Sequence, residues 1–470
     1  MAGRTEPAQF LAQALEQILT AAGIDRAGDC SVQLTGADPV LPTRYPMGTA
    51  GAAALAAVGL AAANLWRSKS GEGQAVAVDV GPAALAMRAN TLLRIDGKPA
   101  ADPWDEISGF HQGADGRWIQ LHCQFPHFRE GVLKLLSADA KRESVAKAIT
   151  TWRIPELEDA LAARGAPAFM LRDHAEWAAH PQGVAVAGLP LIEIERIGDA
   201  PAQQLPSGPR PLSGVRVLDL ARVIAGPMVG RTLAEHGADV LRISGPGLPS
   251  IEQLVIDTGH GKRAAEIDLG SADGRATLKQ LIAGADVFSQ AYRPDSLAAR
   301  GFGPAELARL HPGIVCVSLS AWGRAGPWAA RRGYDTLVQC ATGIAHEQGH
   351  DAKPAHLPGS ALDYLSGYLG AFGAMVALAR RATEGGSWLV RLSLARTAEW
   401  LKALGRTDGA GDPRAQPMPV PGDFGIRLQR AQTHWGEIEF LGPVLRMSAT
   451  PPGFERAVRP LGSDEAGWLA

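Results

Sequence analysis

Cysteine is scarce in this sequence. The 470 residues include only four, Cys30, Cys123, Cys316 and Cys340, and no two of them lie close together in the chain. Such spacing argues against a disulfide scaffold and against a cysteine zinc site. It suits reduced thiols, so we expect a cytoplasmic protein.

An excess of charge of one sign is also missing, because the formal net charge is only −2. No global field would recruit nucleic acid or an anionic membrane, and neither partner is expected. Residues 1–10 lack the charged start and apolar core of a signal peptide. The most apolar stretch, residues 48–65, is rich in alanine and glycine, which favours a buried helix over a membrane span.

The length and composition indicate a folded chain of two or three domains, with 46% hydrophobic and 20% charged residues. A proline-rich stretch at 199–211 separates two halves of different character. We expect a first segment at 1–205, a second at 206–403, and a tail at 404–470 that packs on the larger domain.

The first half combines helices with a few short strands. Helices are expected at 9–22 and from about Gly48, followed by a strand at 74–80. A smaller α+β unit comes next, with a strand at 116–122 and helices near Phe128 and Pro155.

The second half alternates strands and helices. Apolar strands are expected at 215–220, 239–243, 286–288 and 314–320, with helices at 227–236 and 274–283 between them. This alternation is typical of crossover units and a parallel sheet. The predicted fold class is therefore α/β, with a Rossmann-like parallel sheet in the large domain and a smaller α+β domain.

Two stretches of the chain resemble each other and suggest an internal repeat. A shift of 314 positions places residues 47–80 on residues 361–394 and matches Leu55 with Leu369, Gly59 with Gly373 and Val76 with Val390. Both stretches read as a small-residue helix, a glycine turn and a strand. The alternative is chance similarity between alanine-rich helices. In this register Asp363 falls on Thr49, so only the second stretch carries a carboxylate.

The Ala225-Gly226-Pro227 turn follows the first strand of the second half. Backbone N–H groups and the positive end of a helix would meet there at the carboxyl edge of the sheet, where phosphates bind. The turn lacks the G-x-G-x-x-G spacing, so NAD is disfavoured. The alternative is a purely structural crossover.

Several basic residues fall in expected loops near that edge. Each could be an ordinary surface charge, but together they could hold a ligand with several phosphates. They are Arg222, Arg242, Lys262, Arg263, Arg293 and Arg300.

His346-Glu-Gln-Gly-His350 matches the H-E-x-x-H zinc pattern. Glycine inside the motif and Pro354 after it argue against the helix that would place both histidines on one face. We expect a polar loop and no metal site.

Asp363 begins an expected helix that runs to about Thr383. It could be a helix-terminal charge partner, or it could be a carboxylate nucleophile, which needs no separate base when ionised. The helix end would keep it ionised and supply donors to a developing oxyanion.

The second half resembles the class III CoA-transferases, also called the CaiB/BaiF family. The resemblance runs in order through the following motifs: Pro211-Leu-Ser-Gly-Val-Arg-Val-Leu-Asp-Leu-Ala-Arg-Val-Ile-Ala-Gly-Pro227, Leu233-Ala-Glu-His-Gly-Ala-Asp-Val240, Gly261-Lys-Arg263, Ile267-Asp-Leu269, Ala285-Asp-Val-Phe288, Tyr292-Arg-Pro294, Ser320-Ala-Trp-Gly323, Gly333-Tyr-Asp335 and Asp363. The first half resembles the later portion of the family, so the usual order is rearranged or partly duplicated. This order leaves open whether the chain is a monomer or forms the interlocked homodimer of the family.

The resemblance implies that the carboxylate of Asp363 attacks an acyl-CoA thioester to give a mixed anhydride. The CoA thiolate then forms an aspartyl-CoA thioester, from which a carboxylic acid takes the CoA. The implied substrates are an acyl-CoA and a carboxylic acid, with CoA held by Arg222, Val223, Ile224, Ala225, Ile267, Leu269, Tyr292 and Ser296.

The sequence also departs from the family pattern. Ser244 replaces the usual acid after the second strand, Pro294-Asp295 replaces Pro-Gly, and Arg300 stands beside the usual basic position. A degenerate member that binds CoA without turnover is thus one alternative. Another is a 2-methylacyl-CoA racemase, but the Gly-His-Asp pattern of the racemases reads Gly333-Tyr334-Asp335 here, which favours the transferase.

Overall fold

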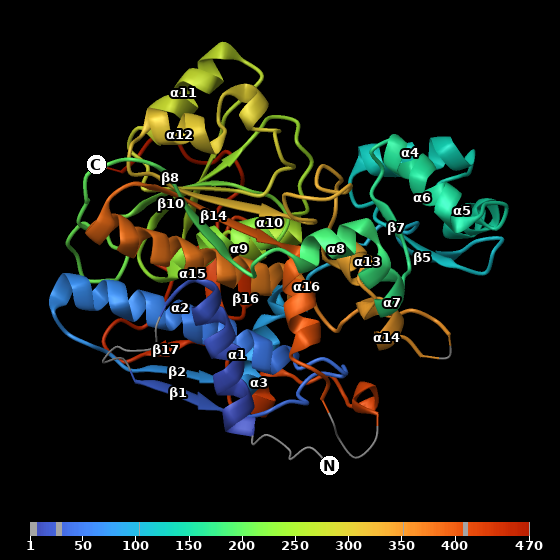
Figure 1. Cartoon of the computed structure of the whole chain (residues 1–470), viewed down its shortest axis with the longest axis horizontal. Coiled ribbons are helices and arrows are strands. Elements are labelled where there is room, and N and C mark those ends of the chain that lie inside the picture. Colours follow the sequence, from blue (N-terminus) through green and yellow to red (C-terminus); the bar gives the residue numbers. More distant parts are fainter. Residues whose placement is uncertain (1–6, 25–30, 103, 351, 408–411, 470) are drawn as a thin grey trace.

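The computed structural model describes residues 7–24, 31–102, 104–350, 352–407 and 412–469 of the chain. It forms a large body around one central sheet and a smaller lobe at one side (Figure 1).

The central sheet has seven strands in the order β11-β10-β9-β12-β13-β14-β8. All neighbours pair in parallel except β8, which runs antiparallel to β14. This confirms the predicted α/β class with a large parallel sheet. The strands are β8 (Glu193–Gly198), β9 (Arg216–Leu220), β10 (Asp239–Ser244), β11 (Lys262–Glu266), β12 (Val287–Gln290), β13 (Val315–Ser320) and β14 (Ser387–Ser393).

Helices cover both faces of this sheet, and successive side chains of each strand reach opposite helical layers. Val217 packs into the core cluster that contains α9 and α15, and Leu218 packs into the cluster that contains α11 and α12. Both side chains are fully buried, as expected for parallel strands covered on two sides. The helices on the sheet and its loops are α9 (Ala225–Glu235), α10 (Glu252–Thr258), α11 (Ala272–Ile282), α12 (Pro304–Leu310), α13 (Asp335–Ala341), α14 (Ile344–Gln348), α15 (Ala361–Glu384) and α16 (Leu394–Ala403).

The predicted duplication is visible in the elements. Helix α2 (Met47–Ser70) and helix α15 both contain 24 residues, and their first residues, 47 and 361, lie 314 positions apart. Strand β2 (Val76–Asp79) and helix α3 (Val80–Ala86) correspond in the same register to the end of β14 and the start of α16. In both units the helix connects two parallel strands, β1 (Val32–Thr35) to β2 and β13 to β14.

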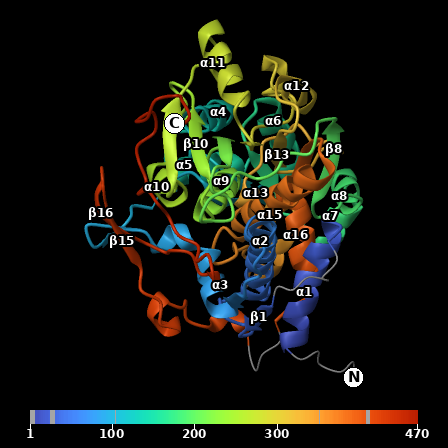
Figure 2. The same cartoon turned by 90° about the vertical axis from the view of Figure 1, so that its left-hand side faces the viewer.

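Each of the two units completes its sheet with a strand from the opposite half of the chain. Strand β8 comes from the first half and pairs antiparallel with β14 of the second. Strand β17 (Arg446–Met447) comes from the C-terminal tail and pairs antiparallel with β2. Because β2 and β14 correspond in the duplication, the exchange is reciprocal. Both long helices, α2 and α15, lie side by side between these sheets (Figures 1 and 2).

Both long helices would be long and apolar enough to cross a membrane. However, 89% of the most apolar window of α2 and 100% of that of α15 are buried inside the protein. They are packed as core helices, and every residue of α15 from Ala361 to Leu378 is buried.

The small lobe, residues 105–170, lies at the right of Figure 1 and has its own apolar core. The strand expected at 116–122 is β6, and the helices expected near Phe128 and Pro155 are α4 and α6. The lobe contains β5 (Gly109–Gln112), β6 (Trp118–Leu121), β7 (Ala168–Met170), α4 (Pro126–Leu136), α5 (Arg142–Ile149) and α6 (Ile154–Ala163), and α7 (His174–Ala179) and α8 (Pro181–Ala187) connect it to β8.

The tail after α16 contacts both halves of the chain. Strands β15 (Gln429–Thr433) and β16 (Gly436–Phe440) form a sheet with β3 (Arg94–Ile95) and β4 (Lys98–Pro99) of the first half. The last described residues lie on the large body, where the Trp468 indole N–H donates to the Leu281 carbonyl at 3.0 Å. Helix α1 (Pro7–Ala21), which accounts for the first predicted helix, packs against α2.

Candidate active site

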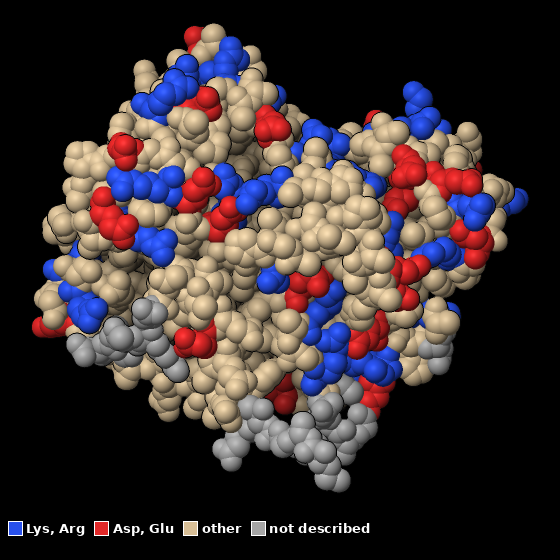
Figure 3. Space-filling view, in the orientation of Figure 1, with Lys and Arg blue, Asp and Glu red and all other residues tan. Residues whose placement is uncertain are grey.

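A cavity of about 690 Å³ opens at the carboxyl edge of the central sheet, between the large body and the small lobe. Its walls are the loops that follow β9, β10, β11 and β12, together with residues of the small lobe. Figure 3 shows a notch between these two parts, bordered by lysine and arginine side chains. Eight of the residues predicted to bind CoA line this one cavity: Arg222, Val223, Ile267, Leu269, Tyr292, Arg293, Ser296 and Arg300.

The loop after β9 has a strained backbone at Val223. This residue has φ +70°, a left-handed conformation that a β-branched side chain rarely adopts. Its neighbour Arg222 lies with its guanidinium 4.7 Å from the centre of the Phe125 ring and donates to the Pro249 carbonyl. Strain of this kind is held only where the surroundings enforce it, and it concentrates at ligand-binding loops.

The cavity is strongly basic. Arg331 and Arg332, which sequence reasoning missed, join Arg222, Arg293 and Arg300 on its wall, and Asp268 is the only acid among the described lining residues. The side chain of Arg293 makes no hydrogen bond or ion pair with any described residue and is available to a ligand. Phe125, His127 and Phe128 of the small lobe also line the cavity, and no pattern in the sequence linked that lobe to this edge.

Five of the predicted CoA-binding residues lie elsewhere. Lys262 is buried and donates to the Asp219 carboxylate and to the Pro227 carbonyl, both at 2.6 Å, and burial lowers its pKa to about 8. Arg263 pairs with Asp239 at 2.9 Å and donates to the Gly467 carbonyl.

The other three of these residues are also buried. Arg242 lines a small side cavity behind Arg222, and Ile224 and Ala225 pack at the start of α9. Lys262 and Arg263 were predicted to bind CoA from their charge and sequence position. In the structure their charges are paired with Asp219 and Asp239, and both residues lie outside the cavity.

Asp363 occupies the first turn of α15, as predicted, and its side chain is only 6% exposed. It makes no ion pair or side-chain hydrogen bond with the residues that the structure describes. The N–H groups at the helix start are taken by another acid, because Asp335 accepts from the N–H groups of Leu362 at 2.8 Å and of Asp363 at 3.0 Å.

The expectation that the helix end keeps Asp363 ionised is therefore wrong for the protein without substrate. Burial, and then the neighbouring charge of Asp335, raise the pKa of Asp363 well above its usual range. Burial also raises the pKa of Asp335, to about 6, although the N–H of Asp363 and the amide of Gln339 oppose the rise. The two carboxyls form one coupled pair.

The pair lies beside the basic cavity. Tyr334, which directly precedes Asp335, lines the cavity, and its pKa is raised to about 12 by burial and, to a smaller extent, by Asp363. One turn beyond Asp363, a side chain added at Gly367 would meet the Ala225 carbonyl oxygen at 2.9 Å. The start of α9, which follows the loop after β9, is thus in direct contact with the helix of Asp363.

A sequence model described as CoA-transferase family III matches residues 20–206 and again residues 212–417. The chain belongs to CoA-transferase family III. The two matches agree with the duplication seen in the fold.

Relatives in this family are CoA-transferases by name. The acetyl-coenzyme A transferase nodX of Hypoxylon pulicicidum is 36% identical over 212 residues, which are 43% of this chain and 36% of that protein. An acyl-CoA transferase of Gibberella moniliformis is 28% identical over 369 residues, covering 67% of this chain and 63% of that one. A probable fatty acyl-CoA transferase of Mycobacterium tuberculosis is 28% identical over 229 residues, 45% of this chain and 58% of the relative. The matches thus cover less than two thirds of each relative.

Two solved structures are similar over part of the chain. The Mycobacterium tuberculosis protein Rv3272 superposes with a TM-score of 0.40 at 28% identity over 42% of this chain and 58% of its own. A CaiB/BaiF family protein from Brucella suis superposes with a TM-score of 0.38 at 25% identity, over 49% of this chain and 65% of its own. The assignment to CoA-transferase family III rests on the sequence match.

In this family member a histidine that sequence reasoning missed lies against Tyr334. The ring of His122 stacks on the Tyr334 ring with centroids 3.9 Å apart, and neither of its ring nitrogens has a hydrogen-bond partner among the described residues. Burial, with a smaller effect of His356, lowers the pKa of His122 to about 3, so the ring is neutral.

The H-E-x-x-H pattern forms no zinc site among the described residues, where no group of three metal-ligating side chains occurs. Helix α14 ends at Gln348, before His350. Glu347 instead accepts hydrogen bonds from Tyr45 and His174, both at 2.6 Å, and pairs with Arg406 at 2.7 Å. Although burial opposes it, these partners hold the pKa of Glu347 well below its usual range.

Proposed function

We propose that the chain is a CoA-transferase that moves CoA from an acyl-CoA to a carboxylic acid, with Asp363 as the nucleophile. The observation that carries the proposal is the pairing of a basic cavity with a buried carboxyl that has no ionic partner among the described residues. The duplicated unit provides an internal comparison, because it has Thr49 in place of Asp363.

The binding of CoA is supported by the charge and position of the cavity. CoA carries several phosphate charges, and five arginines line a cavity at the carboxyl edge of the sheet. In chain order the six parallel strands are arranged 3-2-1-4-5-6, the order of Rossmann-like folds, in which ligands bind at this edge. We assign CoA binding to Arg222, Val223, Ile267, Leu269, Tyr292, Arg293, Ser296 and Arg300 in that cavity, extended by Arg331 and Arg332.

The proposed reaction begins when the ionised Asp363 attacks the thioester carbonyl. The carbon–sulfur bond breaks, the CoA thiolate leaves, and an aspartyl-acyl anhydride forms. The thiolate then attacks the Asp363 carbonyl, which releases the first acid and leaves an aspartyl-CoA thioester. The second acid attacks this thioester, which expels the CoA thiolate and forms a second aspartyl-acyl anhydride. The thiolate then attacks the acyl carbonyl of this anhydride, which gives the new acyl-CoA and restores the Asp363 carboxylate.

Asp335 has a positioning role in this scheme. It accepts from two N–H groups of the helix start, which favours its ionised form, whereas burial and the charge of Asp335 disfavour ionisation of Asp363. Asp363 must be deprotonated, with its proton released to solvent, before it attacks.

Hydroxylamine trapping tests the proposal. The purified protein is incubated with an acyl-CoA, treated with hydroxylamine and digested, and peptides containing Asp363 are analysed by mass spectrometry. We expect a hydroxamate at Asp363 that depends on acyl-CoA and is absent from Asp363→Asn. An unmodified Asp363 under conditions that support CoA exchange would refute the proposal.

His122 favours one second candidate, a 2-methylacyl-CoA racemase. A neutral imidazole whose ring nitrogens have no partner among the described residues, stacked on Tyr334, could take part in moving an α-proton. Incorporation of solvent deuterium at the α-carbon of a branched acyl-CoA, lost in His122→Phe, would identify this activity. Transfer of CoA without deuterium incorporation would exclude it.

A further inference from the structure

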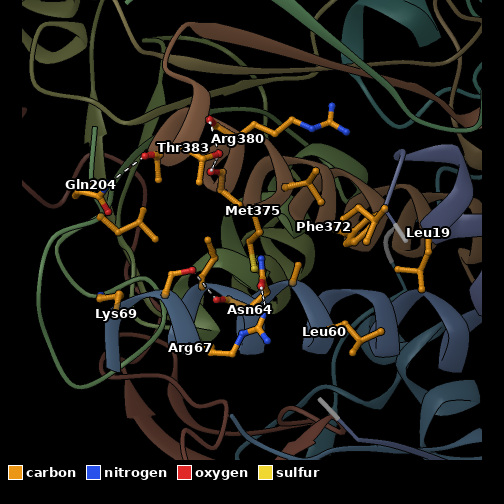
Figure 4. Close-up of a pocket in the computed structure, with 18 of the residues that line it drawn as sticks. Leu19, Leu60, Asn64, Arg67, Lys69, Gln204, Phe372, Met375, Arg380 and Thr383 are labelled. Carbon is orange, nitrogen blue, oxygen red and sulfur yellow. Dashed lines mark hydrogen bonds between the residues drawn. The ribbon is translucent and has the colours of Figure 1, made fainter. Parts of the chain in front are cut away.

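A second cavity lies at the far end of α15 from Asp363. Its volume is about 810 Å³, and it shares no described lining residue with the cavity proposed to bind CoA. Its walls are the C-terminal halves of α2 and α15, the end of α1 and linker residues 204–207 (Figure 4). At a rise of about 1.5 Å per residue, the stretch from Phe372 to Thr383 lies roughly 14 to 30 Å along the helix from Asp363.

More than half of the residues that line this cavity are apolar, and Asn64, Ser68, Gln204, Ser207 and Thr383 add neutral polar groups. Leu60 and Leu65 of α2 face Phe372, Met375 and Val376 of α15 across it. In Figure 4 Met375 reaches down from α15 into the space between the two helices, opposite Asn64 of α2.

Small side chains explain why the space exists. Ala61 of α2 and Ala379 and Ala382 of α15 lie on the wall where larger residues would fill the gap between the helices.

The rim is cationic. Arg67, Lys69 and Arg380 line the cavity, and none of its described lining residues is an aspartate or a glutamate. The partners of Lys69 are the backbone carbonyls of residues 210, 211 and 213, at 3.1 to 3.3 Å. Arg380 donates to the Ala22 carbonyl at 2.6 Å. These neutral partners leave the positive charge of Lys69 and Arg380 uncompensated by any described residue of the wall.

We propose that this cavity binds a long-chain fatty acid, with the acyl tail between α2 and α15 and the carboxylate at the cationic rim. The volume lies in the range of roughly 300 to 1,000 Å³ that is typical of small-molecule sites. The apolar walls remove the tail from water, and the uncompensated cations provide charge-assisted donors for the head group. The proposal concerns a site separate from the transferase centre and does not depend on the proposed function.

Calorimetric titration of the full-length protein with saturated fatty acids from octanoate to palmitate tests it, with CoA present at saturation to occupy the cavity at the sheet edge. We expect the dissociation constant to fall roughly fourfold for each added methylene until the tail fills the cavity. Asn64→Trp should raise the dissociation constant of palmitate at least tenfold, because the exposed Asn64 points into the space that an indole would fill.

Ser70→Trp is the matched control, since it adds an indole to an exposed position of the same helix outside the cavity wall and should leave binding unchanged. Arg380→Gln should weaken the binding of palmitate more than the binding of the alcohol of equal length, because only palmitate carries a carboxylate. This variant tests the proposal if Asn64→Trp fails to fold. Affinity that is independent of chain length, or insensitive to both Asn64→Trp and Arg380→Gln, would overturn the proposal. So would competition between palmitate and CoA, which would place the fatty acid in the transferase cavity.

Discussion

Replacing Asp335 by asparagine tests the electrostatic part of the proposed mechanism. The introduced amide keeps an oxygen that can accept from the N–H groups of Leu362 and Asp363, so the start of α15 remains capped. The substitution removes the negative charge beside Asp363, and it also replaces the Asp335 oxygen that accepts from the Gln339 side-chain amide.

The expected size of the effect follows from the geometry. Asp335 Oδ2 lies 3.0 Å from the backbone nitrogen of Asp363, which places the two carboxyl groups on the order of 6 Å apart. At an effective dielectric constant near 20, two unit charges at about 6 Å interact by about 2.8 kcal/mol, or about 2 pKa units. Burial remains in the variant, so the pKa of Asp363 should fall by about this amount and stay above its usual value.

The assay is the pH profile of kcat/KM for CoA transfer. Asp363 is reactive only when ionised, so activity is lost as pH falls through its pKa. A lower pKa should therefore move the acid limb of the profile of Asp335→Asn to lower pH, by about 2 units.

The duplicated unit supplies the control. Asp38 accepts from the N–H groups of Gly48 and Thr49 at the start of α2, as Asp335 does at α15, but Thr49 stands where the second unit has the proposed nucleophile. Asp38→Asn should leave the pH profile in place. An acid limb that does not move in Asp335→Asn, or moves to higher pH, would refute the electrostatic reasoning.

Three other experiments address the site and the strand exchange. Asp363→Asn should raise the free energy of unfolding, because burial raises the pKa of Asp363 and the folded protein loses stability as pH rises toward that pKa; denaturation should show a larger gain at pH 8 than at pH 4.5. Arg293→Gln should raise the KM for acyl-CoA about tenfold in steady-state kinetics, because Arg293 lines the cavity. Arg263→Gln should leave this KM unchanged and lower the melting temperature in thermal unfolding, because Arg263 pairs with Asp239. Since β8 and β17 are exchanged within one chain, we expect a monomer by light scattering, and a concentration-independent dimer would contradict this interpretation.

The sequence was sufficient to predict the parallel sheet and the duplication. The alternation of apolar strands and helices predicts the parallel sheet. The 314-residue shift that matches Gly59 with Gly373 predicts the duplication, and the structure has two helices of equal length in these positions. The reciprocal exchange of β8 and β17 could not be predicted, because β17 is only two residues long and its pairing depends on the tertiary arrangement.

The candidate site was predictable where it follows the strand ends. Residues directly after parallel strands converge at one edge, which is why Arg222, Ile267 and Arg293 line one cavity. Lys262 and Arg263 start a strand instead, and their partners, the buried Asp219 and the half-buried Asp239, could not be paired with them from sequence spacing. The contribution of the small lobe, including His122, depends on how two separately folded parts meet.

Formation of a covalent bond between CoA and Asp363 is tested most directly by reduction of the intermediate with borohydride. The protein is mixed with an acyl-CoA, treated with borohydride and digested, and peptides are sequenced by mass spectrometry. We predict that the residue at position 363 is reduced to the corresponding alcohol only when acyl-CoA is present. Transfer activity with no reduction at Asp363, or reduction at another residue, would contradict the account.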